Sequence, residues 1–220
     1  MLKLDDRTYL HEAGGILPHR SRLGGRSAVS PGPLTPSRLA DLGGTHTLHY
    51  NSWWYCSFST HAVRTVGMPL RIFIHGDDLE YGLRLRHHGF PTTCPGGLSI
   101  WHASFDGKHR TWIHYFNFRN HIIRLLTQQG DMANSPQVAL THLRRIVTAH
   151  LMRNHYGAAA LTLRAYTDLL ADPTAYQHIT DYPAFIHDLN TTYQSAHTDL
   201  TPSQHSITCL LYTSPSPRDA

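Results

Sequence analysis

The stretch Ile72-Phe73-Ile74-His75-Gly76-Asp77-Asp78-Leu79-Glu80-Tyr81 decides the predicted fold. It begins within a short, β-branched apolar run, residues 70–74, which is typical of a buried strand. It continues into a helix that we expect to start at Asp77 and to end at Gly89, because acidic residues favour the first turn and glycine favours the end. A strand followed directly by such a helix predicts an α/β fold with a ligand site at the carboxyl end of the strand.

The paired carboxylates Asp77 and Asp78 are the strongest candidate for chemistry. The positive end of a helix favours the ionised form of a carboxyl group, so an aspartate there suits a general base or a cation ligand near neutral pH. The alternative is an ordinary helix cap with an acidic first turn. Spacing alone leaves both interpretations open.

Two further signals flank this stretch. Upstream, alternation over residues 45–50 predicts a strand that runs into the adjacent indoles Trp53 and Trp54. Neighbouring residues of a strand face opposite sides, so either one indole faces a ligand such as a sugar, or two packed layers take one indole each. Downstream, a short strand over residues 98–101 ends at His102, which is either a metal ligand or simply one of 19 histidines.

Beyond residue 110 the apolar spacing is helical. It predicts helices over about residues 112–129, 138–151, 158–170 and 182–189. We therefore expect two parts, 1–109 with mixed strands and helices and 110–200 with helices alone. Residues 18–44 are rich in proline, glycine and serine, which predicts a long flexible loop.

Composition excludes several classes of protein. The chain has 220 residues, of which 40% are hydrophobic and 15% are charged, enough for a packed core and too few charges for a disordered polyelectrolyte or a long coiled coil. The net charge of +4 permits contact with phosphates or an anionic membrane surface without requiring either. Three cysteines form no closed disulfide framework, so we expect a reduced, cytoplasmic protein.

An ordered set of motifs resembles glycosyltransferase family 2, and within it the bacterial galactofuranosyltransferases. The motifs are, in chain order, Tyr50-Asn51-x-Trp53-Trp54-x-Cys56, Gly67-x-Pro69-Leu70-x-x-Phe73-Ile74-x-x-Asp77-Asp78-x-Glu80-Tyr81-x-x-Arg84, Gly89-x-Pro91-Thr92, Pro95-Gly96, Trp101-His102 and Phe116-x-x-Arg119-Asn120. The resemblance covers roughly residues 1–129, and the helical remainder is compatible with it. The combination of motifs is specific, whereas each one alone is not.

The resemblance implies the C-terminal part of a GT-A domain, a Rossmann-like α/β fold, followed by a helical region. It implies an inverting transfer of a sugar, with galactofuranose favoured, from a UDP-sugar donor to a cell-surface glycan. By the same resemblance, Asp78 is the general base that takes the proton of the acceptor hydroxyl. Asp77 and Glu80 are expected to order the sugar and the acceptor.

The remaining expected roles also come from the resemblance. Trp53 and Trp54 would line the acceptor or sugar pocket, and His102 would bind the Mn²⁺ or Mg²⁺ that neutralises the departing diphosphate. The partners are then a UDP-sugar and a glycan or lipid-linked glycan acceptor, with no nucleic acid. A basic, amphipathic helical region favours peripheral contact with the inner face of the membrane.

The chain departs from the family pattern at both ends. The family's metal site also uses an Asp-x-Asp motif, which this sequence lacks, so we expect a fragment without the nucleotide-binding half that is inactive alone. Residues 209–219 resemble the in-frame translation of a sequencing adapter, and we expect them to be disordered. Two other functions stay open: a non-catalytic helical scaffold, and a histidine-rich metal-binding protein.

Overall fold

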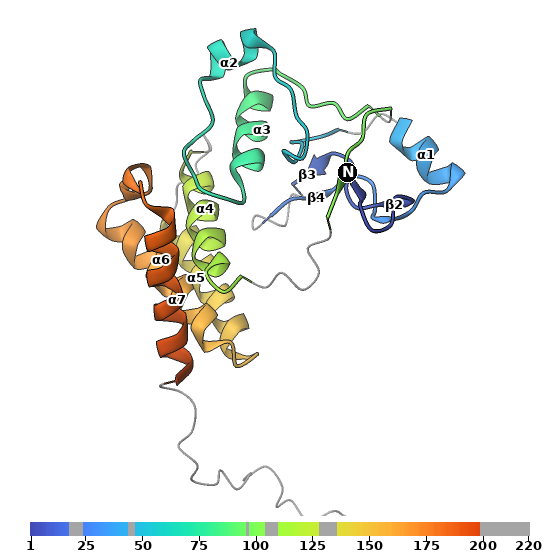
Figure 1. Ribbon diagram of the computed structural model, residues 1–220. Coiled ribbons are helices and arrows are strands. Elements are labelled where there is room, and N and C mark those ends of the chain that lie inside the picture. The colour runs from blue at the N-terminus through green and yellow to red at the C-terminus, as the bar shows by residue number, and fades with distance from the viewer. Residues whose placement is uncertain (18–23, 44–46, 96, 104–109, 128–135, 199–220) are drawn as a thin grey trace, which may run out of the picture.

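The computed structural model describes residues 1–17, 24–43, 47–95, 97–103, 110–127 and 136–198. Two parts follow one another along the chain, an N-terminal part with all the described strands and a C-terminal part of packed helices (Figure 1). This mixture agrees with the predicted α/β class. A GT-A domain and the boundary at residue 109 stay predictions, and the proposed adapter segment lies outside the described residues.

Short strands organise the N-terminal part. They are β1 (Leu2–Lys3), β2 (Tyr9–Leu10), β3 (Gly15–Ile16), β4 (Arg26–Ser27), β5 (Gly32–Pro33) and β6 (Trp101–His102). Four form a mixed sheet in the order β5-β2-β1-β6, in which β1 and β6 are parallel and the other neighbours are antiparallel. The strands β3 and β4 form a separate antiparallel pair. The parallel pairing brings His102 beside the start of the chain, opposite Lys3.

Seven α-helices and one 3₁₀-helix complete the described fold. They are α1 (Pro36–Gly43), α2 (Thr60–Val66), α3 (Asp77–His87), α4 (Ile113–Thr127), α5 (Pro136–Leu151), α6 (Tyr156–Ala171), the 3₁₀-helix η1 (Ala175–His178) and α7 (Tyr182–Thr198). The predictions of α3, α4, α5 and α6 are confirmed, and α7 is longer than its apolar spacing indicated. Helix α6 packs against α4, α5 and α7, so the main apolar core lies among these four helices.

Three local predictions are wrong. Residues 70–73 form no strand, and the chain bends through residues 74–76 with left-handed backbone angles before α3 begins. The segment 18–44 is no simple loop, because its described part contains β4, β5 and α1. The strand predicted over residues 45–50 is reduced, in its described part, to isolated bridges at Leu48 and Tyr50. A short apolar or alternating run does not specify which strand it pairs with, so contacts with the rest of the protein determine its backbone conformation here.

Candidate active site

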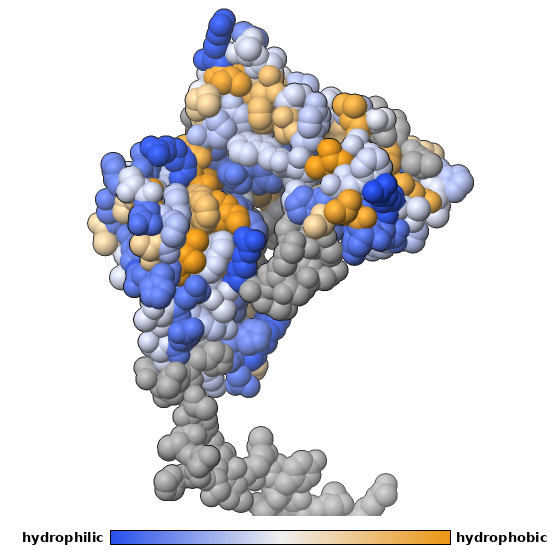
Figure 2. Space-filling view, viewed as in Figure 1, coloured by the Kyte–Doolittle hydropathy of each residue, from blue (hydrophilic) through white to orange (hydrophobic). Residues whose placement is uncertain are grey.

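The start of helix α3, with Asp77 and Asp78, borders two cavities. The larger has a volume of about 1290 Å³ and lies between the N-terminal part and the helices, and the smaller has a volume of about 370 Å³. Asp78, Trp53 and Trp54 line both cavities, whereas Asp77 lines the larger one. In the space-filling view, mostly hydrophilic residues border the hollow between the two parts (Figure 2). The structure therefore brings together four of the six predicted site residues.

Asp78 has an unusual protonation equilibrium. The pKa of its carboxyl group is raised from 3.8 to about 6, chiefly by burial and in addition by the negative charges of Asp77 and Glu12. The backbone N–H of Leu79, 2.7 Å from Oδ1, acts in the opposite direction because it stabilises the carboxylate. A carboxyl group with this pKa is mostly ionised at pH 7 and still binds a proton readily, which is what a general base requires.

Two residues of this site, Glu12 and Ser52, carried no signal in the sequence. Glu12 follows β2 and lines both cavities together with Ser52. The Ser52 hydroxyl donates a hydrogen bond to the Glu12 carboxylate. The charges of Glu12 and Asp78, after burial, also raise the pKa of Tyr50. Among the described residues, the larger cavity thus holds three carboxylates, of which Glu12 comes from a segment far along the chain from Asp77 and Asp78, and only the folded chain brings them together.

Trp53 and Trp54 lie in a turn, and their surroundings differ. The Trp53 ring packs edge-on against Tyr81, with centroids 6.0 Å apart, and belongs to the small core between α2 and α3. The Trp54 ring lies 4.7 Å from the His102 ring. The two indoles therefore contact different neighbours, and both border the cavities. Whether one of them faces a ligand stays a prediction.

His102 lies behind Trp54 and is not among the residues that line either cavity. Its Nδ1 is 2.7 Å from the carbonyl oxygen of Ala103, which places a hydrogen on Nδ1, so that of the two ring nitrogens Nε2 carries the lone pair that a metal would bind. Within the described part of the chain, no three His, Cys, Asp or Glu side chains are grouped so that they could hold a metal ion. These residues alone do not fit a complete metal site, and His102 supplies at most one ligand.

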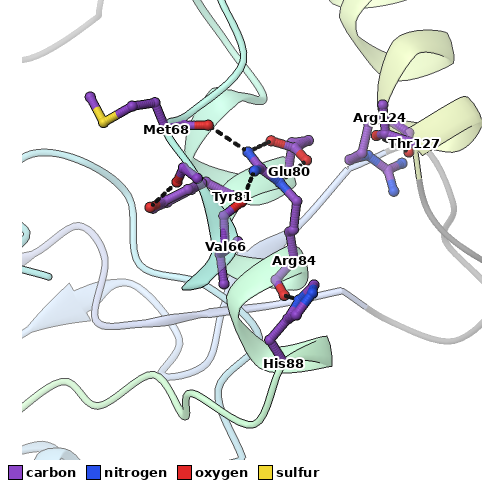
Figure 3. A network of polar contacts seen from close by, with 9 residues as sticks. Val66, Met68, Glu80, Tyr81, Arg84, His88, Arg124 and Thr127 are labelled. Atoms are coloured by element: carbon purple, nitrogen blue, oxygen red, sulfur yellow. Dashed lines mark hydrogen bonds and ion pairs between the residues drawn. The ribbon is translucent and has the colours of Figure 1, made fainter. Parts of the chain in front are cut away.

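Glu80 is not among the residues that line either cavity. It is 3% exposed, and its two carboxylate oxygens accept hydrogen bonds of 2.8 and 3.0 Å from Arg84 (Figure 3). Arg84 also donates to the carbonyl oxygens of Val66 and Met68, at 2.9 and 3.2 Å. This geometry does not place Glu80 in the predicted contact with a sugar or an acceptor. The pair instead ties α3 to the end of α2.

Histidines form part of the opposite wall of the larger cavity. His114 of α4, His150 of α5 and His155, which precedes α6, all line it. The rings of His114 and His150 are 4.9 Å apart, and those of His150 and His155 are 6.5 Å apart. Burial, followed by the effect of these neighbours, lowers the pKa of His114 to about 4. This imidazole is therefore neutral at pH 7 and offers hydrogen bonds without charge.

Comparison with known proteins gives two related sequences, and no protein-family model matches the chain. The chain is 34% identical to galactofuranosyltransferase GlfT2 of Mycobacterium tuberculosis over 127 residues, which are 56% of this chain and 20% of the relative. It is 29% identical to galactofuranosyltransferase GlfT2 of Mycolicibacterium smegmatis over 186 residues, which are 79% of this chain and 28% of the relative. The predicted resemblance to galactofuranosyltransferases is confirmed. The chain spans between a fifth and three tenths of the length of these relatives.

Proposed function

We propose that the chain forms the acceptor side of an inverting glycosyltransferase active site, with Asp78 as the general base. The observation that carries this proposal is the position of Asp78, a partly buried carboxylate that opens into both cavities with a pKa of about 6. The names of the related proteins support galactofuranose as the transferred sugar. A glycan as the acceptor is part of the proposal.

In the proposed reaction, Asp78 accepts the proton of an acceptor hydroxyl. The acceptor oxygen forms a bond to the anomeric carbon while the bond from that carbon to the diphosphate breaks. Attack and departure on opposite faces invert the anomeric configuration. Asp77 and Glu12 line the same cavity as Asp78 and are the polar side chains that orient sugar hydroxyls, and Trp54 offers an apolar face to a sugar ring.

The proposal includes a divalent metal for which the described residues supply one ligand. Bound Mn²⁺ or Mg²⁺ would neutralise charge on the departing diphosphate, and His102 would be one ligand. Its remaining ligands and the uridine site would come from outside the described residues, as the missing Asp-x-Asp motif also indicates. No step assigned to Asp78 depends on the metal.

The cellular context is also a proposal. We infer a lipid-linked or polymeric glycan acceptor, and peripheral contact of the chain, whose net charge is +4, with the inner face of the membrane in the cytoplasm. The described helices include none with the length and apolar character needed to cross a bilayer. Sedimentation with anionic and with neutral liposomes tests the membrane contact, and equal binding to both would contradict an electrostatic attachment.

The catalytic proposal is tested by transfer from UDP-galactofuranose to a synthetic galactofuranosyl oligosaccharide, followed by mass spectrometry. The assay uses the chain alone and a chimera in which the chain replaces the matched segment of the M. tuberculosis relative. Asp78→Asn should lower turnover by about 10³-fold or more, while binding of the oligosaccharide, measured by calorimetry, persists. Asp181→Asn, at the exposed start of α7, is the matched control. Retained turnover in the Asp78→Asn chimera would exclude Asp78 as the base.

A further inference from the structure

The loop that leads into α3 has a conformation that its own sequence disfavours. Ile74, His75 and Gly76 have φ angles of 45°, 64° and 87°, three successive residues in the left-handed region. Glycine adopts such angles readily, whereas a β-branched isoleucine rarely does. A backbone of this kind persists only where surrounding contacts hold it. The next two residues along the chain are Asp77 and Asp78, so whatever holds the loop also sets the position of the proposed base.

Asn120 of α4 makes those contacts. Its side-chain Nδ2 lies 3.0, 2.6 and 2.9 Å from the carbonyl oxygens of Phe73, Ile74 and His75. Asn120 is 2% exposed, so water does not substitute for these bonds. The left-handed turn points three carbonyl oxygens to one spot, where the buried amide NH₂ group donates its two hydrogens, so that two of the oxygens share one hydrogen.

Arg119 fixes which way the Asn120 amide faces. Its Nε donates a 3.0 Å hydrogen bond to Oδ1 of Asn120, so the amide must turn its NH₂ group toward the loop. The guanidinium carbon of Arg119 lies 4.7, 5.7 and 5.8 Å from the ring centroids of Phe116, Tyr115 and Tyr176. Arg119 is itself 2% exposed. This aromatic cage holds the guanidinium, which in turn orients the amide.

We propose that Asn120 is a positioning residue for Asp78: through its three bonds to the loop, α4 of the helical part sets the position of the first turn of α3. The inference rests on the function proposed for Asp78. It also gives the helical part a defined role in the reaction, because a residue of α4 then controls the geometry of a base carried by the N-terminal part.

Asn120→Asp is the sharpest variant, because it has nearly the same shape. The carboxylate keeps an acceptor for Arg119 and gains an ion pair with it, but it offers no hydrogens to the three carbonyl groups. Asn190→Asp is the matched control. The Asn190 side-chain oxygen accepts a hydrogen bond from Thr111, which an aspartate also accepts, and it lies on α7 away from the loop. If Asn120→Asp does not fold, Asn120→Ser replaces it, with the same expectations.

The first measurement is hydrogen exchange by mass spectrometry on the whole chain. Exchange in residues 74–80 should be about tenfold faster in Asn120→Asp than in the wild type, with α6 and α7 unchanged. Asn190→Asp should match the wild type in the loop. Unchanged loop exchange in the Asn120 variant overturns the proposal, whether or not the chain transfers a sugar.

The second measurement is transfer in the chimera with the M. tuberculosis relative. A displaced base should lower kcat, calculated from the concentration of folded enzyme, about tenfold or more while KM for the acceptor changes less than about twofold. Circular dichroism supplies the folded fraction, because a loss of folded enzyme alone also lowers the apparent kcat at constant KM. Faster loop exchange with unchanged kcat would leave Asn120 a purely structural role and overturn the proposal. Absence of transfer in the wild-type chimera would instead refute the proposed function, and loop exchange would still decide whether Asn120 holds the loop.

Discussion

Substituting Asp78 by asparagine should stabilise the fold at neutral pH. The folded protein raises the pKa of Asp78 from 3.8 to about 6, so between these values it binds a proton that the unfolded chain releases. Stability therefore falls as the pH rises from about 4 to about 6, and the loss is complete above the folded pKa. With about 1.4 kcal/mol for each pKa unit, the ionised carboxylate costs up to about 3 kcal/mol at pH 7.5.

Urea unfolding followed by tryptophan fluorescence measures this effect. Asparagine keeps the oxygen that accepts the Leu79 N–H, so Asp78→Asn removes the charge with little change of shape. We expect its free energy of unfolding to exceed that of the wild type by up to about 3 kcal/mol at pH 7.5, and the gain to vanish near pH 4. Asp181→Asn, whose side chain caps α7 by accepting from the N–H of Ala184 at 3.0 Å, should change stability by less than about 0.5 kcal/mol. A less stable Asp78→Asn variant at pH 7.5, or a gain that does not depend on pH, would refute the reasoning.

Three further predictions test the packing around the site. A Cβ added at Gly82 would lie 2.4 Å from Cβ and 2.7 Å from Cα of Tyr50. Gly82→Ala should therefore lower the free energy of unfolding by about 1–3 kcal/mol. Unchanged stability in a urea titration would contradict this close approach. Glu80→Gln weakens the hydrogen bonds to Arg84 and should lower the free energy of unfolding by about 1–3 kcal/mol. The affinity for the acceptor, measured by calorimetry, should not change. Weaker acceptor binding at unchanged stability would instead indicate that Glu80 contacts the substrate. Burial lowers the pKa of His114 from 6.5 to about 4, so the neutral imidazole supports the fold above pH 6.5, and this stability is lost as the pH falls toward 4. In unfolding curves measured over a pH series, His114→Gln should remove up to about 3 kcal/mol of this acid-induced loss of stability. An acid profile that is the same in the variant and the wild type would contradict the prediction.

Periodicity in the sequence was sufficient for the long helices. The helical spacing after residue 110 predicted α4, α5 and α6, and the acidic first turn predicted the start of α3, because these signals are local. The strand predicted from the apolar run at residues 70–74 is absent because the conformation of this run depends on contacts that are distant in the sequence. Its composition favours a strand, but the contacts of Asn120, more than forty residues later, hold the adjoining residues in a left-handed turn.

The candidate site divides in the same way. Asp78, Trp53 and Trp54 stood out by residue type and order, and the structure places them around shared cavities. Glu12 and Ser52 are forty residues apart in the chain and carry no motif, so only the fold shows that they join the site. Glu80 was assigned from its place in a motif, yet the side chain four residues along the helix takes both of its carboxylate oxygens.

The central claim, that Asp78 removes the acceptor proton, is tested most directly by the pH dependence of kcat/KM for the acceptor in the chimera with the M. tuberculosis relative, because kcat/KM reports ionisation of the free enzyme. The wild-type kcat/KM should rise through a midpoint near pH 6 and fall about tenfold for each pH unit below it. Glu12→Gln removes a negative charge that helps to raise the pKa of Asp78, so it should move this midpoint to lower pH. A kcat/KM that stays constant between pH 5 and 8, or a midpoint that does not respond to Glu12→Gln, would contradict the account.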